Sequence, residues 1–359
     1  MDNKNWSIQQ FWNDTALPNN SWPIAPRDYI YATEIGAPFI EVFWKLKGEP
    51  ATNDFSDLVV RKMEAGNFME NLIVWVFKRC GILKEWQGTV RFEDEKYLPV
   101  HGRLDVIAGH DGNWDETIKT VEQFYESMDQ AWLDFPYYNI AKEKSRILLE
   151  GLAKQYPNGL SDKIYEIKSL NSHAFWKSNG ERIGTPYDRH RKQLGIYQIV
   201  KNLPGSFLYI DRDTMAISEI PNILTDDLKK EIFNWLEKIT FYYRNNIEPP
   251  LPDLVVWNED KKQWTLNWEV ERSIYRDKIL GNKKMADIIN LVQQKNIIQK
   301  EKENIDKVMA GKEFRGSKKY NEIKELLHNP FIDKEELSSQ YGISVEALEY
   351  WENTYPEEG

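Results

Sequence analysis

Three side chains in two strand-like runs of this sequence could together hydrolyse a phosphodiester bond. Glu166 and Lys168 lie in the run KIYEIKSL, and Asp105 lies upstream in the run HGRLDVIA. Residues two apart in a β-strand point to the same side, so Glu166 and Lys168 would face one site while Tyr165 and Ile167 face the core. Carboxylates hold Mg²⁺, and a nearby lysine can orient water or stabilise developing charge.

The chemistry of phosphodiester hydrolysis defines what each residue would do. The reaction needs an in-line water, neutralised phosphoryl oxygens and help for the leaving group, most of which one or two Mg²⁺ or Mn²⁺ ions supply. Asp105 and Glu166 are the expected metal ligands, with the carbonyl of Ile167 as a further one. Lys168 is the expected catalytic lysine. The tripeptide alone is no evidence, because Glu-Ile-Lys recurs at residues 322–324, in what reads as an exposed helix.

The composition indicates a packed globular protein from a reducing compartment. The chain has 359 residues, 41% of them hydrophobic, with 14 Trp and the single cysteine Cys80. One cysteine excludes an intrachain disulfide framework and a cysteine-ligated metal cluster. The N-terminus shows no signal-peptide pattern, and the apolar run LIVWVF is too short to span a bilayer. We therefore expect a cytoplasmic protein that makes no membrane contact.

The net charge of the chain limits how it could bind a nucleic acid. At −10, it argues against broad, passive nucleic-acid binding, which usually leaves a basic footprint on the surface. It does not exclude a nuclease, because a local basic channel can lie on an acidic body and metal-binding carboxylates are themselves acidic.

Strand and helix patterns alternate through the first part of the chain, which predicts an α/β fold. Apolar residues at helical spacing predict a long helix over 57–80. Strands are expected over 87–93, 99–108 and 163–170. In the strand over 99–108, alternation places Arg103 on the same face as Asp105.

A helix is expected to follow the strand that carries Glu166. Thr185 suits the N-cap and Pro186 the first helical position, and the helix should end near Asn202. Three of its polar side chains fall on one face, at helical spacing: His190, Gln193 and Tyr197.

Composition shifts divide the chain into segments. Residues 1–28 are polar and Trp-rich and are expected to wrap the surface, and 29–253 would form the core. A helical insertion is expected over 109–161. Beyond a proline-rich boundary, 254–280 form a Trp-rich tail and 281–359 a helical C-terminal region.

Four short motifs in a fixed order resemble the PD-(D/E)XK nuclease superfamily. Gly-x-x-Asp occurs at 102–105, Glu-x-Lys at 166–168 and Gln-x-x-x-Tyr at 193–197, preceded at 66–70 by a glycine with an acidic residue four positions later. The pattern looks most like the RecB/Cas4-like exonuclease branch. The resemblance spans residues 30–280 and implies a restriction-endonuclease-like core, with a central mixed sheet flanked by helices.

The resemblance also implies site roles. Glu70 becomes a metal ligand beside Asp105 and Glu166. Gln193 and Tyr197 would pack beside the site and contact DNA. The remaining expected DNA contacts are side chains that can carry positive charge: His190, Arg103 and Arg191.

The branch often carries a 4Fe–4S cluster, and here the chain departs from it. Val270, Ser273 and Ile279 stand where the tail of such proteins has cysteines. Because a cluster needs about four thiolates, we expect a relative without an iron–sulfur cluster. Its tail would be held by the packing of three aromatic side chains: Trp264, Trp268 and Tyr275.

A second departure concerns spacing. The family usually joins the aspartate strand to the Glu-x-Lys strand by a short hairpin, whereas a long stretch separates Asp105 from Glu166 here. Either a helical insertion has been added or Asp105 is the wrong aspartate. The insertion is favoured, because no later strand-like segment before Glu166 offers a better carboxylate.

The C-terminal region resembles a helix-turn-helix of low specificity. Its second helix carries Glu346, Glu349 and Glu352 and no Lys or Arg, which argues against major-groove reading and favours contact with a protein partner or a capping role. The lysine-rich helix before it could track phosphates, although charge runs are usually solvated faces.

The sequence therefore predicts a Mg²⁺- or Mn²⁺-dependent deoxyribonuclease, with exonuclease favoured over endonuclease action. The family setting implies recombination, repair or phage DNA processing in a bacterial or phage-infected cell. Two alternatives stay open: a nuclease-fold protein that binds nucleic acid or protein without cutting, and a structure- or sequence-specific endonuclease. Strand preference and oligomeric state do not follow from the sequence.

Overall fold

A computed structural model describes most of the chain. The described residues are 24–53, 57–127, 138–177, 179–258 and 262–309, with the shorter stretches 322–323, 326–327, 333–341, 343–346 and 348–349. Most of the expected N-terminal wrap lies outside them. The chain divides into two compact units, Met1–Leu251 and Pro252–Gly359, and the division falls within the proline-rich run 248–252.

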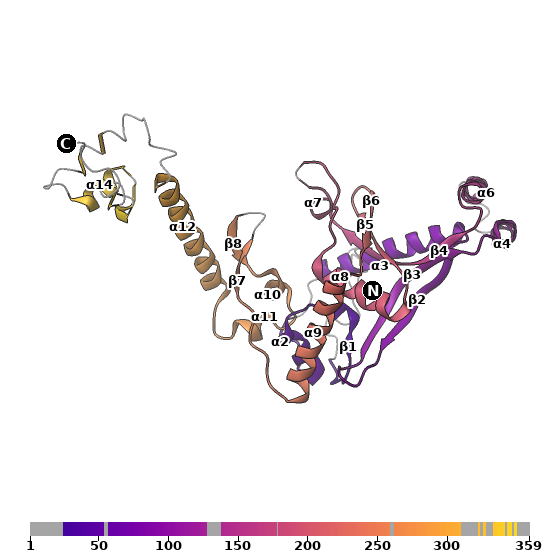
Figure 1. Ribbon diagram of the computed structural model, residues 1–359, viewed down its shortest axis with the longest axis horizontal. Coiled ribbons are helices and arrows are strands. Elements are labelled where there is room, and N and C mark those ends of the chain that lie inside the picture. Colours follow the sequence, from indigo (N-terminus) through magenta and orange to yellow (C-terminus); the bar gives the residue numbers. More distant parts are fainter. Residues whose placement is uncertain are drawn as a thin grey trace, which may run out of the picture. The chain divides into compact units, whose positions relative to one another are not determined.

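The first unit is built on a six-stranded mixed sheet (Figure 1). Its strands are β1 (Ile30–Tyr31), β2 (Leu83–Phe92), β3 (Val100–His110), β4 (Leu160–Leu170), β5 (Gly205–Asp211) and β6 (Ile217–Asn222). β3 pairs antiparallel with β2 and β4, and β4 runs parallel to β5, which pairs antiparallel with β6. The parallel step from β4 to β5 needs a crossover, and the helix α8 (Asp188–Lys201) lies in it.

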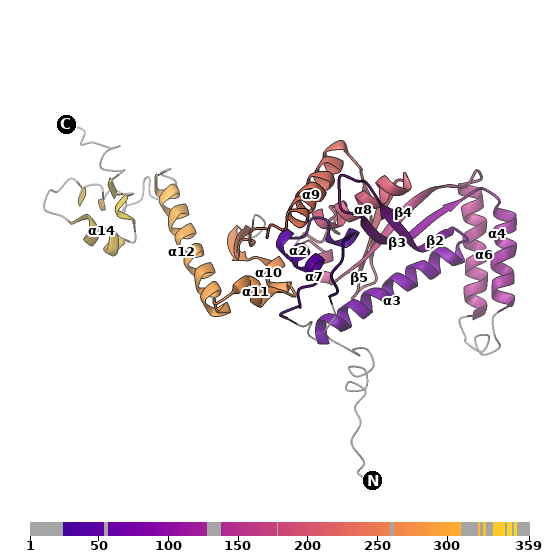
Figure 2. The same ribbon diagram turned by 90° about the horizontal axis from the view of Figure 1, so that it is seen from below.

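Helices cover both faces of this sheet, which confirms the α/β class with a central mixed sheet. The long helix α3 (Asp57–Arg79) packs on one face, where Ile73 and Val74 join Val106, Ile167 and Leu208 in an apolar core. Figure 2 shows α3 crossing beneath the strands. α8 packs on the other face and is in turn covered by α9 (Asp226–Arg244), which also contacts α2 (Phe39–Lys47).

The start of α8 differs from its sequence prediction. The helix begins at Asp188 with Tyr187 as its N-cap residue, so Thr185 is not the cap. The backbone N–H of Tyr187 donates to the hydroxyl of Tyr209 on β5 at 3.3 Å, and Tyr187 stays extended. A tertiary contact therefore overrides the local capping signal of Thr185-Pro186. The helix ends as predicted, with Asn202 in the left-handed region.

A change of partner along one edge of β3 opens the sheet. β1 pairs with β3 at Val100 and His101, whereas β4 pairs with it from Val106 onward. Because β2 occupies the other edge over nearly the whole strand, β1 and β4 must share this edge. Residues 102–105 of β3 therefore lie in a gap between them. The motif residues of β3 fall in this gap.

The segment between β3 and β4 is helical where the structure describes it. The helices α4 (Trp114–Glu126) and α6 (Tyr138–Gln155) pack together through Trp114, Val121, Tyr125 and Leu149, and Figure 2 shows them side by side. β3 and β4 remain direct neighbours on the sheet. The long separation of Asp105 and Glu166 in sequence thus does not separate them in the fold.

The second unit begins with the hairpin β7 (Val255–Asn258) and β8 (Gln263–Leu266), followed by α10 (Trp268–Arg272) and α11 (Arg276–Leu280). α12 (Met285–Met309) is tied to β8 because the Asn296 side chain both accepts from and donates to the backbone of Trp264, at 2.6 and 2.9 Å. Of the three aromatic residues expected to hold this tail, Tyr275 is fully buried, but Trp268 is 54% exposed. Trp268 therefore does not pack as predicted.

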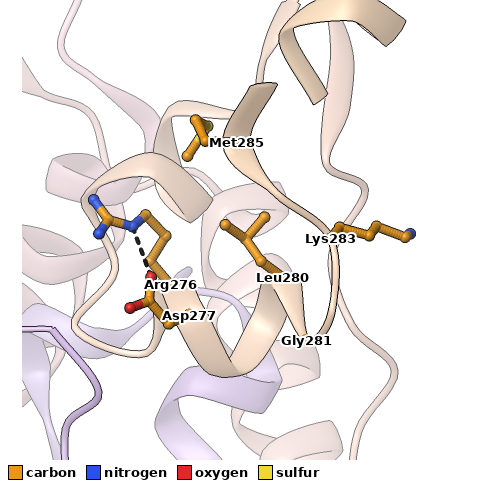
Figure 3. Close-up of a pocket in the computed structure, with 6 residues that line it drawn as sticks. All are labelled: Arg276, Asp277, Leu280, Gly281, Lys283 and Met285. Carbon is orange, nitrogen blue, oxygen red and sulfur yellow. Dashed lines mark hydrogen bonds and ion pairs between the residues drawn. The ribbon is translucent and has the colours of Figure 1, made fainter. Parts of the chain in front are cut away.

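The three positions where the resemblance places cysteines are all buried. Val270 and Ile279 are buried apolar side chains, and the Ser273 hydroxyl accepts the backbone N–H of Tyr275 at 3.1 Å. Beside them, α11 and the start of α12 enclose a small hollow of about 290 Å³ (Figure 3). Its Arg276 and Asp277 pair with each other at 3.2 Å and are both well exposed, so the hollow holds no strained or buried charge.

Farther along, the described part of the C-terminal region has a small apolar core. It is formed by Ile323, Leu327, Leu337, Ile343 and Leu348, around α14 (Lys334–Tyr341). In the second Glu-Ile-Lys copy, Glu322 and Ile323 are helical, and Ile323 is buried in this core.

Several apolar side chains of α12 remain exposed: Ile289, Leu291, Ile297 and Ile298. The expected contact of this region with a partner protein stays a prediction. In the part of the chain that is described, none of the helices has the length and apolar character needed to cross a membrane.

Candidate active site

The gap beside β3 opens into a hollow of about 460 Å³. Its wall combines the first turn after β1, four residues of β3, and side chains from β2, β4, α3 and α8. The residues that line it are Tyr31, Ala32, Thr33, Glu70, Gln87, His101, Gly102, Arg103, Asp105, Glu166, Lys168, Gln193 and Tyr197. The structure thus brings the three expected catalytic residues into one place.

Glu166 lies at the floor of this hollow and is fully buried. Its Oε1 accepts two hydrogen bonds of 2.6 Å each, from Lys168 Nζ and from Gln193 Nε2. Its Oε2 is buried without a partner among the described residues. Burial raises the pKa of Glu166, although the charge of Lys168 opposes the shift. One half of this carboxylate is therefore fixed and the other half is left without a donor.

Asp105 is held by the backbone of the neighbouring strand. Its Oδ2 accepts the N–H of Ile167 at 2.7 Å, just beyond the last β3–β4 pair of Val106 and Tyr165. Burial, and then the negative charge of Glu166, raise the pKa of Asp105 well above its usual range. Because the N–H and C=O of a strand residue lie on the same edge, the Ile167 carbonyl also faces the gap.

Lys168 faces the same hollow as Glu166, as the strand parity predicts. Burial alone would lower the pKa of Lys168, but the carboxylates of Glu166 and Asp105 outweigh burial and raise it. The raised pKa favours the ammonium form of this side chain. Its position beside two carboxylates suits a group that neutralises developing charge.

Gln193 and Tyr197 reach the hollow from α8 and are almost fully buried, at 5% and 1% exposed. Gln193 Nε2 donates to Glu166, and the Tyr197 hydroxyl donates to the carbonyl of Arg103 at 3.3 Å. A Cβ on Gly102 would lie 2.6 Å from the Tyr197 ring, so the glycine permits this approach. Both side chains hold the site together here, and their contact with DNA stays a prediction.

Glu70 extends from α3 to the edge of the hollow. Its charge raises the pKa of Asp105 and of Glu166, and its Oε1 accepts from Gln87 Nε2 on β2. Gly66, one turn earlier, lies close to β4: a Cβ there would meet Ser169 Oγ at 3.3 Å. The glycine of this motif thus has a packing reason, because it lets α3 approach the strand.

These residues suit a hydrated Mg²⁺ or Mn²⁺ more than a fully protein-bound ion. In the described part of the chain, no three His, Cys, Asp or Glu side chains gather into a ready-made metal group. Mg²⁺, however, keeps several waters and commonly takes only one or two carboxylates from the protein. Asp105 and the unpartnered Oε2 of Glu166 supply that number, and burial raises the pKa of both carboxyl groups despite the nearby charge of Lys168.

Of the remaining expected DNA contacts, only Arg103 lines the hollow. Arg103 is exposed at the mouth of the hollow. His190 does not line the hollow: its Nδ1 lies 2.9 Å from the Tyr209 hydroxyl, and burial lowers its pKa to about 3. A neutral His190 brings no charge to a phosphate. Arg191 is half-buried on α8 and also lies outside the lining, so its contact with DNA stays a prediction.

Sequence reasoning did not find the aromatic rim of the hollow. Tyr31 is 45% exposed, and the Arg27 guanidinium lies 4.5 Å above its ring. Tyr29 contacts Tyr31 edge-on and stacks on His101 at 4.3 Å. Such rings offer surfaces on which nucleic-acid bases stack. The only sequence signal is the pair of tyrosines in the run YIY.

Comparison with known proteins adds little. No protein-family model matches the sequence, and no curated protein is significantly similar to it. One similar solved structure, titled "Crystal structure of SSO0001", is 14% identical over 78% of this chain and 98% of that chain, with a TM-score of 0.39. A TM-score this low carries no argument about fold family or activity.

Proposed function

We propose that the protein is a Mg²⁺- or Mn²⁺-dependent deoxyribonuclease with a PD-(D/E)XK-type core, and that it acts as an exonuclease. One observation carries the proposal: Asp105, Glu166 and Lys168 line the same hollow at a break in the sheet, and Glu166 keeps one buried oxygen without a partner. Carboxyl groups whose pKa values are strongly perturbed by burial and by a specific charged neighbour cluster at functional sites.

Each residue of the hollow has a task in this proposal. Asp105 and Glu166, with the Ile167 carbonyl and Glu70 at the edge, would hold the ion. When bound, the ion supplies charge neutralisation and Lewis acidity at the phosphoryl group. Lys168 stabilises the charge that develops on the phosphoryl oxygens or orients the attacking water.

The residues around this centre fix its geometry. Gln193 holds Oε1 of Glu166, which leaves Oε2 to face the hollow. The Ile167 N–H holds Oδ2 of Asp105. Arg103, exposed at the mouth, can contact a phosphate, and the exposed ring of Tyr31 can stack on a base. These contacts let a strand of DNA approach an otherwise acidic protein.

The test is release of nucleotides from end-labelled linear DNA by the purified full-length protein. We expect cleavage with Mg²⁺ or Mn²⁺ and none with excess EDTA. A closed circular substrate in parallel separates exonuclease from endonuclease action, because a circle offers no end. Binding of DNA without any metal-dependent cleavage would overturn the proposal and favour a non-cleaving member of the fold.

A further inference from the structure

Gln87 has an unusual backbone conformation for its place in the sheet. In the described residues, positive φ angles of non-glycine residues occur at Gln87, Asn202, Met215, Asn246 and Lys262. Of these, Gln87 alone lies within a strand, with φ of 55°, whereas the others lie outside the helices and strands. A left-handed residue of this kind costs about 1–2 kcal/mol, so something at the site must offset the strain.

The strained conformation places the Gln87 side chain at the catalytic hollow. The β2–β3 register pairs Trp86 with Val106 and Gly88 with Leu104, which puts Gln87 across from Asp105. Gln87 lines the hollow and donates its Nε2 hydrogen to Glu70. The Gln87 amide therefore ties the Glu70 side chain to β2, at the position that lies across from Asp105 on β3.

The other end of the same amide is left without a partner. Gln87 Oε1 is buried and accepts no hydrogen bond from the described residues. Leaving a buried carbonyl unpaired costs about 1–3 kcal/mol, which adds to the strain of the backbone. Glu166 Oε2, in the same hollow, is the second such oxygen. Two buried acceptors at the hollow are therefore without a donor among the described residues.

The chemistry of this space favours a cation. Its buried acceptors are a neutral amide oxygen and carboxylates, and the nearby side chains of Lys168 and Gln193 each donate one hydrogen bond to Glu166 Oε1. Side-chain amide oxygens, carboxylates and waters are the ordinary ligands of hard divalent ions. A cavity that binds an apolar group would not leave these oxygens unpaired inside it.

We propose that Gln87 belongs to the cation site: its Oε1 binds a hydrated Mg²⁺ or Mn²⁺, directly or through one of the waters of the ion, while its Nε2 holds Glu70. The inference rests on the metal dependence of the proposed function but extends it to a residue outside all four motifs. It explains why a strained residue is retained in the middle of β2.

The test measures Mn²⁺ binding to the full-length protein without DNA, by calorimetry and by the electron paramagnetic resonance signal of free Mn²⁺. Gln87→Leu should weaken Mn²⁺ binding about 10- to 100-fold, the usual effect of losing a supporting group at a metal site. Gln87→Glu should tighten it at least threefold, since it adds a carboxylate. Trp86→Leu, at an exposed neighbour on β2, should change nothing.

The outcomes separate this inference from the proposed function. Wild-type affinity in Gln87→Leu overturns the role of Gln87. Should Gln87→Leu fail to fold, Gln87→Glu decides, because unchanged or weaker Mn²⁺ binding there also overturns it. If the wild-type protein binds Mn²⁺ through Gln87 but does not cut DNA, the proposed function fails while the Gln87 inference stands. If the wild-type protein binds no Mn²⁺, the inference fails.

Discussion

Asp105 Oδ2 accepts the backbone N–H of Ile167 at 2.7 Å, immediately beyond the point where β3 and β4 stop pairing. The aspartate thus replaces a backbone acceptor that the sheet no longer supplies. Left unpaired in a buried position, that N–H would cost about 1–3 kcal/mol. Asp105 therefore has a structural task in addition to its proposed catalytic one, and substitutions can separate the two.

Asp105→Asn keeps an acceptor for Ile167 but removes the negative charge next to Glu166. We expect the free energy of unfolding in EDTA to rise by about 0.5–2 kcal/mol, as is common when a destabilised functional group is neutralised. Metal-dependent cleavage should be lost in the same variant. Urea denaturation and the nuclease assay measure the two effects. Asp105→Ala is the control, because it also removes the acceptor and should be less stable than Asp105→Asn.

The pH dependence of stability follows from the same pair. The pKa values of Asp105 and Glu166 are raised in the folded protein, so these two groups bind protons more tightly in the folded state than in the unfolded state. Their favourable contribution is complete below the unfolded carboxyl pKa, about 4, and is lost as pH rises through the folded values. In EDTA, wild-type stability should therefore fall relative to Asp105→Asn as pH rises. If the urea midpoints of the wild-type protein and of Asp105→Asn change equally with pH over this range, the prediction is contradicted.

Gly102 should tolerate no side chain. A Cβ there would lie 2.6 Å from Tyr197 Cε1 and 2.9 Å from the Cβ of Ala32, so Gly102→Ala forces α8 or the first turn away from β3. Overpacking of this kind costs about 1–3 kcal/mol. Gly151→Ala is the matched control, because nothing lies within 4 Å of a Cβ on this helical glycine. The control should be neutral or slightly stabilising in thermal unfolding, and equal losses in both variants would count against the packing argument.

Gln193 should act through Glu166 rather than on DNA directly. Its hydrogen bond lowers the pKa of Glu166, so Gln193→Leu should raise that pKa and move the acidic limb of the pH–rate profile to higher pH. The rate should fall about 10- to 100-fold. Gln198→Leu is the matched control: this glutamine is equally buried on α8 but bonds to Asn222 on β6. It should cost stability without moving the pH profile.

Much of the sheet could be predicted from short-range patterns. The alternation in β3 correctly separates buried Leu104 and Val106 from Asp105, because side chains of successive strand residues point to opposite faces. The same parity correctly places Ile167 in the core and Glu166 opposite. The start of α8 was less predictable than the start of α3, which begins at Asp57 as expected. A contact between Tyr187 and Tyr209, distant in sequence, decides where α8 begins.

The parts of the site that escaped prediction depend on tertiary structure. Gln87 takes a left-handed conformation within a strand, which no local preference of glutamine favours; only the Gln87-Gly88 pair hints at an irregular strand. The hollow itself exists because one edge of β3 pairs first with β1 and farther along with β4, which leaves a gap between them. The sequence of a single strand does not reveal which strands it pairs with or in which register. The charge pattern likewise suggested His190 as a phosphate contact, whereas burial keeps it neutral.

The most direct test of the account compares two lysines on β4. Lys168 lies beside Glu166 in the hollow, whereas Lys163 pairs with Glu219 at 2.9 Å. Cleavage of end-labelled linear DNA should require Mg²⁺ or Mn²⁺, fall about 100- to 1000-fold in Lys168→Ala, and stay near the wild-type rate in Lys163→Ala. Wild-type cleavage by Lys168→Ala, or no metal-dependent cleavage by the wild-type protein, would contradict the account.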